Sequence, residues 1–144
     1  MMKNPYQKAY EDNRIFSASR GELIVMLYEG AIRFNEKAIE NMHFKTYDKV
    51  NHFISRSLDI IVELKTSLNL EAGGEIARNL DALYDYLLER LRIANKDKDK
   101  KIIEETNKIL SELLSAWKTI TQKDFSTSSH KTPSTKLDGL SLKG

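Results

Sequence analysis

Apolar residues recur every three or four positions in four separate stretches of the chain, which is the periodicity of amphipathic helices. The first stretch begins at Ser19, where the Ser-x-x-Glu spacing to Glu22 predicts a capping box, and it should end near Met42. The other three are predicted at about 46–68, 75–94 and 99–120. Between them lie a turn at 43–45, a break at 69–74 with paired glycines, and the charged run NKDKDKK at 95–101, which is typical of a solvated loop.

Long helices joined by short connections favour antiparallel neighbours, and no stretch alternates with a period of two. We therefore predict an all-α fold, an antiparallel four-helix bundle over residues 19–120. Residues 1–18 should form a short N-terminal helical segment that packs on the bundle or covers part of it. Residues 121–144 are rich in Ser and Thr and lack a helical apolar period, so we expect a flexible, disordered C-terminal tail.

The first and third helices carry more apolar residues than one buried face requires. At about 100° per residue, the expected core-facing residues of the first helix are Leu23, Leu27, Ala31, Phe34 and Ala38, flanked by Ile24 and Tyr28. Val25, Ile32 and Ile39 gather on another side, and Met26 points in a third direction. The expected core stripe of the third helix is Ile76, Leu80, Leu83, Tyr84, Leu87 and Leu91, with Ala82, Tyr86 and Ile93 away from it. Contact with two neighbouring helices explains a wide apolar sector, and an exposed apolar patch for a partner explains it equally.

Composition and charge remove several classes of function. The net charge is +2, with 23 basic and 21 acidic residues interleaved, whereas nucleic-acid binders concentrate basic residues in a patch. The chain has no cysteine, its three histidines lack metal-site spacing, and it has no glycine-rich phosphate loop. We therefore predict no enzymatic activity, no cofactor and no metal. No apolar run reaches the roughly 20 residues of a membrane span and no secretory signal is present, so we expect a cytoplasmic protein.

The N-terminal motifs resemble those of a known family. The sequence has YEDN at 10–13, SAS at 17–19 followed by EL at 22–23, and MLYEGAI at 26–32. Together they resemble the signature of the flagellar export chaperone family FliS, and the similarity in helix number and length extends over about the first 120 residues, including Trp117. Two positions depart from the family pattern: Arg20 stands where proline is usual, and Glu29 where aspartate is usual. Both residues are compatible with a helix.

The resemblance implies a cytoplasmic chaperone of the bacterial flagellar type III export system. Such a protein binds the C-terminal region of flagellin in apolar surface grooves, prevents premature polymerisation and delivers the subunit to the export gate. On this basis the expected client-binding residues are Val25, Met26, Ile32, Tyr86 and Ile93, with Tyr6, Tyr10 and Ile15 as a groove cover or further client contacts. The expected partners are flagellin, an export-gate component and, without client, a second copy of the chain. The alternative is a generic helical adaptor or self-associating bundle with no flagellin client.

Overall fold

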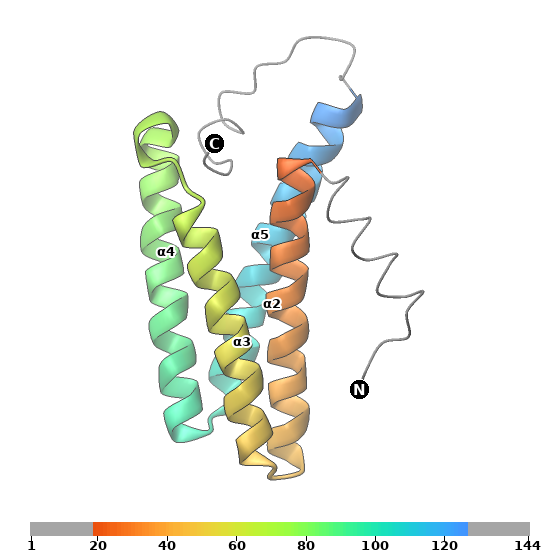
Figure 1. Ribbon diagram of the computed structural model, residues 1–144, viewed down its shortest axis with the longest axis vertical. Coiled ribbons are helices and arrows are strands. Elements are labelled where there is room, and N and C mark those ends of the chain that lie inside the picture. Colours follow the sequence, from red (N-terminus) through yellow and green to blue (C-terminus); the bar gives the residue numbers. More distant parts are fainter. Residues whose placement is uncertain (1–18, 127–144) are drawn as a thin grey trace.

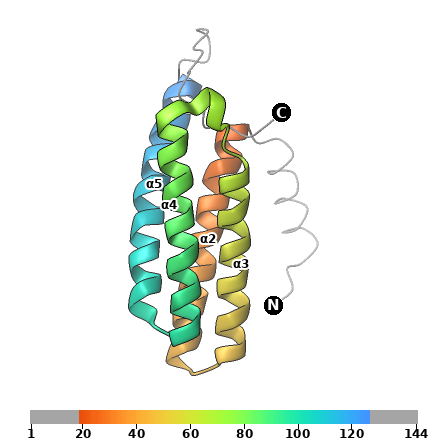
Figure 2. The same ribbon diagram turned by 90° about the vertical axis from the view of Figure 1, so that its left-hand side faces the viewer.

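The computed structural model describes residues 19–126, which form four α-helices: α2 (Arg20–His43), α3 (Tyr47–Thr66), α4 (Leu70–Asp97) and α5 (Lys100–Ser126). Successive helices run in opposite directions (Figures 1 and 2). α2 packs against α3 and α5, and α4 packs against the same two helices. The antiparallel four-helix bundle predicted from the apolar periodicity is confirmed. The predicted N-terminal helical segment lies outside the described residues.

The first helix begins where the capping motif predicts. Ser19 is the N-cap of α2, and its hydroxyl oxygen accepts a hydrogen bond from the backbone N–H of Glu22 at 3.2 Å. The same hydroxyl donates to the carboxylate of Glu22 at 3.2 Å. The helix continues to His43, and Lys45 then turns the chain with a positive φ of 57°. Arg20 occupies the first helical position.

The connection between α3 and α4 differs from the predicted break at 69–74. Asn69 already caps α4, because its side-chain oxygen accepts from the N–H of Ala72 at 3.0 Å. The paired glycines lie within α4 rather than before it. Gly74 adopts φ 56° and ψ −134°, a backbone conformation that residues with a Cβ rarely adopt, and α4 is kinked at this position. After this kink Ala77 enters the core, whereas Ile76 is 43% exposed. The assignment of Ile76 to the core was therefore wrong.

The charged run at 95–101 is mostly helical rather than a loop. α4 continues to Asp97 and α5 begins at Lys100, so only Lys98 and Asp99 separate them. Lys98 ends α4 in the left-handed conformation, and a carboxylate oxygen of Asp99 accepts from the N–H of Lys101 at 3.0 Å. At its other end α5 passes the predicted limit of Ile120 and reaches Ser126.

Apolar side chains from all four helices form one core. Its largest fully buried apolar members are Tyr28, Tyr84, Ile24, Ile54, Ile61, Leu64, Leu87, Leu91, Ile103, Leu110 and Val50. On α2 the buried face follows Ile24, Tyr28 and Ala31, and the predicted core residues Leu23, Leu27 and Phe34 are only half-buried. The core face of α2 is thus rotated from the predicted one, toward the residues expected at its edge.

A pair of tyrosine hydroxyls lies inside this core. The hydroxyls of Tyr28 on α2 and Tyr84 on α4 are hydrogen-bonded to each other, and the Trp117 side chain of α5 also hydrogen-bonds to Tyr28. Burial raises the pKa of Tyr28 to about 12. Burial, and then the proximity of Tyr28, raises the pKa of Tyr84 as well. Both phenols therefore stay neutral at physiological pH and connect three helices through hydrogen bonds.

Candidate functional site

The predicted second stripe of α2 lies against α5. Val25 and Ile32 are half-buried and pack against the core rather than standing on a free face. Val25 also lines a hollow of about 260 Å³ together with Lys118, Thr121 and Gln122 of α5 and with Glu22. We call the line of contact between these two helices the α2–α5 seam. Of the two explanations for this stripe, contact with a neighbouring helix applies to Val25 and Ile32, because α5 approaches α2 on that side.

Polar side chains hold the α2–α5 seam together at its centre. The amide of Asn35, which is fully buried, donates to the side-chain oxygen of Asn107 at 2.8 Å. Asn107 in turn donates to the backbone carbonyl of Ile32 at 3.3 Å. An ion pair between Lys118 and Glu29, at 3.7 Å, also crosses the seam. Sequence reasoning missed these links, although Asn35, seven residues after Tyr28, is a polar residue at a core-spaced position.

Two glycines set how closely α2 approaches its neighbours. A Cβ at Gly21 would lie 3.0 Å from the side-chain oxygen of Thr121 on α5, and a Cβ at Gly30 would lie 3.2 Å from the terminal methyl of Ile60 on α3. Both distances are shorter than ordinary van der Waals contact. Glycine therefore lets α2 approach α5 closely at Gly21 and α3 closely at Gly30.

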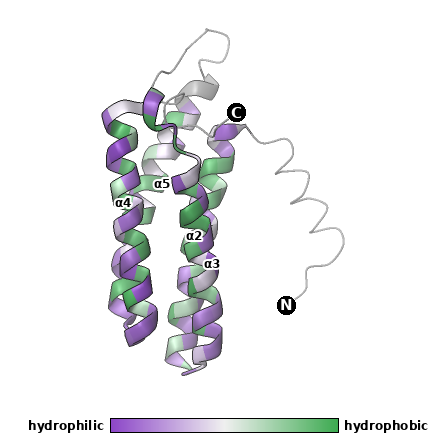
Figure 3. Cartoon of the chain, turned by 60° about the vertical axis from the view of Figure 1, so that its left-hand side comes forward, coloured by the Kyte–Doolittle hydropathy of each residue, from purple (hydrophilic) through white to green (hydrophobic). Residues whose placement is uncertain are grey.

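The two predicted residues of α4 differ in burial. Tyr86 is 51% exposed, and Ile93 is half-buried against the core. Tyr86 stands one helical turn before Arg90, whose guanidinium group pairs with Glu105 of α5 at 3.8 Å. We call the line of contact between α4 and α5 the α4–α5 seam, and Tyr86 is exposed on α4 one turn from the ion pair that crosses it. Figure 3 shows hydrophilic and apolar residues alternating along α4.

Met26 belongs to neither seam. It precedes Tyr28 by two residues, or about 200° around the helix, and so faces away from the core tyrosine while remaining half-buried. On the neighbouring contact between α2 and α3, Phe34 stacks on Phe53 with ring centroids 6.2 Å apart, and Arg56 lies over Phe34. The structure therefore places the five predicted client-binding residues in three regions. Two of these regions flank α5.

Titratable side chains of the bundle form ion pairs that link neighbouring helices. A hydrogen bond to Asp81 at 2.7 Å is the largest cause of the raised pKa of Lys65, and Asp85 lies 3.5 Å from the same ammonium group, so these groups link α3 to α4. Within residues 19–126, no cluster of three or more histidine and acidic side chains could hold a metal ion. In the same residues, no helix combines the length and apolar character needed to cross a membrane. Together these features define an all-helical bundle protein with half-buried apolar residues along its helix contacts.

Comparison with known proteins assigns this helical bundle to a family. The sequence model of the family described as "Flagellar protein FliS" matches residues 2–124, and the chain belongs to that family. The flagellar secretion chaperone FliS of Salmonella typhimurium is 38% identical over 122 residues, covering 82% of this chain and 88% of the relative. That of Vibrio cholerae is 32% identical over 112 residues, covering 78% and 82%. That of Bacillus subtilis is 31% identical over 123 residues, covering 85% and 90%.

Membership in this family shows the general role of the protein. FliS proteins are flagellar secretion chaperones, so the chain has a chaperone role in flagellar export. The prediction that it is not an enzyme is confirmed by the same assignment, since the family consists of chaperones. The resemblance read from the motifs at 10–32 is confirmed by the match over nearly the whole chain.

Proposed function

We propose that this chaperone binds the C-terminal region of flagellin in the bacterial cytoplasm, prevents its premature polymerisation and delivers it to the flagellar type III export apparatus. The observation that carries the proposal is the pair of apolar seams on either side of α5. Val25 and Ile32 line the α2–α5 seam, and Tyr86 and Ile93 stand on α4, which packs against α5 as well. A client segment that crosses α5 reaches both.

A client that is disordered before binding loses conformational entropy when it is ordered, and buried apolar area must offset that loss. An amphipathic client helix gains such area by laying its apolar face along a groove between two helices. Tyr86 supplies the largest exposed ring of the two seams, and Val25 adjoins an open hollow. Met26 offers a further contact on α2, where a flexible thioether adapts to different client side chains.

The proposal is tested by calorimetric titration of the full chain with a peptide covering the C-terminal region of flagellin from the same organism. Tyr86→Ala should weaken binding about tenfold, as truncation of an aromatic anchor does, without changing the melting temperature. Tyr47→Ala is the matched control, because Tyr47 is 44% exposed but lies at the start of α3, away from both seams. Equal affinity of the two variants would contradict the assignment of the α4–α5 seam. Absence of any binding to the folded chain would contradict the flagellin client itself.

The predicted groove cover, Tyr6, Tyr10 and Ile15, lies outside the described residues. We propose that residues 1–16 occupy client-binding surface until the client displaces them. Deletion of residues 1–16 should then preserve or raise the affinity for the flagellin peptide. A strong loss of affinity would make these residues part of the binding surface instead of its cover.

The alternative of a self-associating bundle or general adaptor makes a different prediction. Sedimentation of the chain without client should then show a mass that rises with concentration, and the flagellin peptide should not reverse it. The proposed client instead competes with any homodimer that uses the same seams. Binding to an export-gate component, the remaining expected partner, should be tested on the chaperone–client complex.

A further inference from the structure

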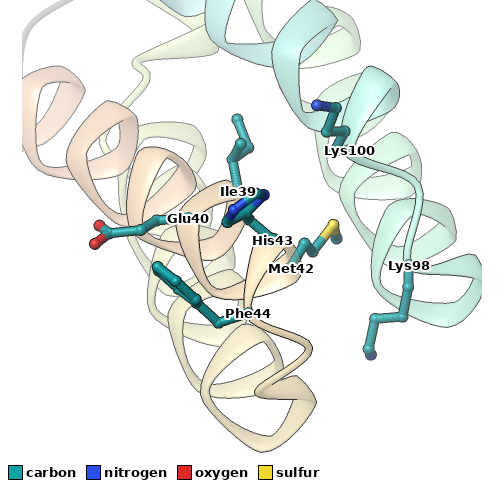
Figure 4. A pocket seen from close by; sticks show the side chains of 7 residues that line it. All are labelled: Ile39, Glu40, Met42, His43, Phe44, Lys98 and Lys100. Carbon is teal, nitrogen blue, oxygen red and sulfur yellow. The ribbon is translucent and has the colours of Figure 1, made fainter.

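A pocket lies at the end of the bundle where the α2–α3 turn meets the α4–α5 turn. Its volume is about 470 Å³. It is lined by Ile39, Glu40, Met42, His43, Phe44, Lys98 and Lys100, and we call it the turn-end pocket. Figure 4 shows Met42 between the two turns, Lys100 reaching back toward α2, and Glu40 pointing away from the lysines.

The floor and one rim of the turn-end pocket are apolar. Ile39 and Met42 are half-buried, and the ring of Phe44 is 66% exposed with its neighbour His43 packed edge-on at 5.1 Å between centroids. A single exposed aromatic residue is common on protein surfaces. Here, however, the ring stands beside a hollow whose remaining apolar side chains are also accessible, which provides a place for an apolar side chain from another molecule.

The opposite rim is positively charged. Lys98 adopts φ 52° at the end of α4, a position where glycine is usual. Its ammonium group donates to the side-chain oxygen of Asn51 at 2.5 Å and to the backbone and side-chain oxygens of Asn95 at 2.6 and 2.7 Å. These three neutral acceptors use all the donors of an ammonium group. Lys98 is therefore a fixed positive charge, with no ion-pair partner among residues 19–126.

Lys100 is the charge that is available to a ligand. It makes no ion pair within the described part of the chain, and its side chain extends across the pocket toward Ile39 (Figure 4). Within the described residues, Glu40 is the one acidic residue that lines the pocket, and its side chain points away from Lys98 and Lys100 (Figure 4). A carboxylate oxygen of Asp99 is engaged by the N–H of Lys101, and neither Asp97 nor Asp99 lines the pocket. The turn-end pocket thus combines an apolar floor with an unbalanced positive rim.

We propose that the turn-end pocket is a second docking site, and that it binds an acidic, amphipathic segment of a partner protein. An apolar side chain of the segment enters between Ile39, Met42 and Phe44, and a carboxylate pairs with Lys100 in the field of Lys98. The charge of the rim selects an acidic segment over a basic one. This site is separate from the proposed client surface, because none of the five client-binding residues lines it.

The two methionines of the described bundle allow the site to be located directly. The full chain, labelled with ¹³C at its methionine methyl groups, is titrated by NMR with a 14-residue helical peptide that carries leucines on one face and glutamates on the other. The Met42 methyl signal should shift, while the Met26 signal should not, since Met26 lies on another part of α2. A peptide with lysine in place of every glutamate should bind at least tenfold more weakly. Equal binding of the two peptides, or a shift at Met26 alone, would overturn the proposal.

Charge reversal provides the matched pair of variants. Lys100→Glu should weaken binding of the acidic peptide at least tenfold, and Lys108→Glu, which makes the same change on an exposed part of α5 outside the pocket, should leave it within twofold. Equal losses in the two variants would show only a general charge effect and would refute the site.

The same variants separate this proposal from the flagellin proposal. Lys100→Glu should leave the affinity for the flagellin peptide within twofold, and Tyr86→Ala should leave the affinity for the acidic peptide within twofold. If Lys100→Glu abolishes both, the pocket is part of the client surface and a second docking site is refuted. If flagellin binding fails in every variant while Met42 still reports the acidic peptide, the turn-end pocket stands without the proposed client.

Discussion

Replacement of Tyr28 by phenylalanine tests whether the buried hydroxyl cluster stabilises the bundle. In the native protein the Tyr28 hydroxyl meets the Tyr84 hydroxyl and the side chain of Trp117, and all three residues are almost completely buried. Tyr28→Phe keeps the ring and its packing. It removes only the oxygen that hydrogen-bonds to the Tyr84 hydroxyl and the Trp117 side chain. The measured change in stability therefore reports the hydrogen bonds and not the filling of the core.

The expected loss of stability follows from the groups that are left without partners. A buried polar group without a partner costs about 1–3 kcal/mol. Tyr28→Phe leaves two, the Tyr84 hydroxyl and the Trp117 N–H, so the free energy of unfolding should fall by about 2–4 kcal/mol. Tyr84→Phe leaves the Tyr28 hydroxyl bound to Trp117 and should cost about 1–2 kcal/mol. In the double variant only Trp117 lacks a partner, so its loss should be smaller than the sum of the two single losses by about 2 kcal/mol.

The assay is urea unfolding at pH 7 followed by far-ultraviolet circular dichroism for the native chain, both single variants and the double variant. Equal slopes of the transitions would show that the midpoints report stability alone. Strictly additive losses, or single losses below about 0.5 kcal/mol, would refute the reasoning, because they would mean that the hydroxyls do not share one buried network.

Three further predictions rest on other contacts. The raised pKa values of the two phenols contribute stability that is complete below the unfolded pKa of about 10 and is lost as pH rises toward the folded pKa. The free energy of unfolding should therefore fall between about pH 10 and 12, and it should fall less steeply in the Tyr28→Phe/Tyr84→Phe double variant. Identical pH profiles of the native chain and the double variant would contradict this prediction. The hydroxyl of Ser57 is buried without a partner, so Ser57→Ala should stabilise the chain by about 1 kcal/mol in urea unfolding, whereas a loss would show that the hydroxyl is bonded. Gly30→Leu should lower stability by about 2 kcal/mol through crowding against Ile60, measured against Gly30→Ala, and equal stability of the two variants would show that the contact yields easily.

The sequence predicted the helices well because their signals are local. The start of α2 follows from the Ser19–Glu22 spacing, and the antiparallel order follows from short connections between long apolar repeats. The errors occurred where local preference and packing disagree. Paired glycines indicated a break before α4, but Asn69 caps a helix that begins before them and tolerates the kink at Gly74. The charges of the run at 95–101 predict a loop, although alternating charges are equally compatible with the exposed face of a helix.

Within the candidate site, the sequence predicted the exposure of one residue correctly but could not predict which helix lies beside each residue. Tyr86 was expected away from the core and is half exposed. For Val25 and Ile32 the sequence left open a free face and a contact with a second helix, and the structure places them against α5. A helical projection gives angles around one axis and contains no information about which neighbour occupies each angle. The turn-end pocket was not predicted at all, since it joins Phe44 and Lys100, which are far apart in the sequence.

The sequence by itself determined the helical class, the number of helices, the main capping signal and the family, because periodicity, capping and motif spacing are properties of consecutive residues. Only the tertiary structure decided which apolar residues face a neighbouring helix, which hydroxyls and amides pair inside the core, and where hollows open between helices. These depend on the rotation and separation of whole helices. Contacts between distant segments set both quantities, such as Gly21 against Thr121 and Tyr28 against Tyr84, and no single stretch of the chain encodes them.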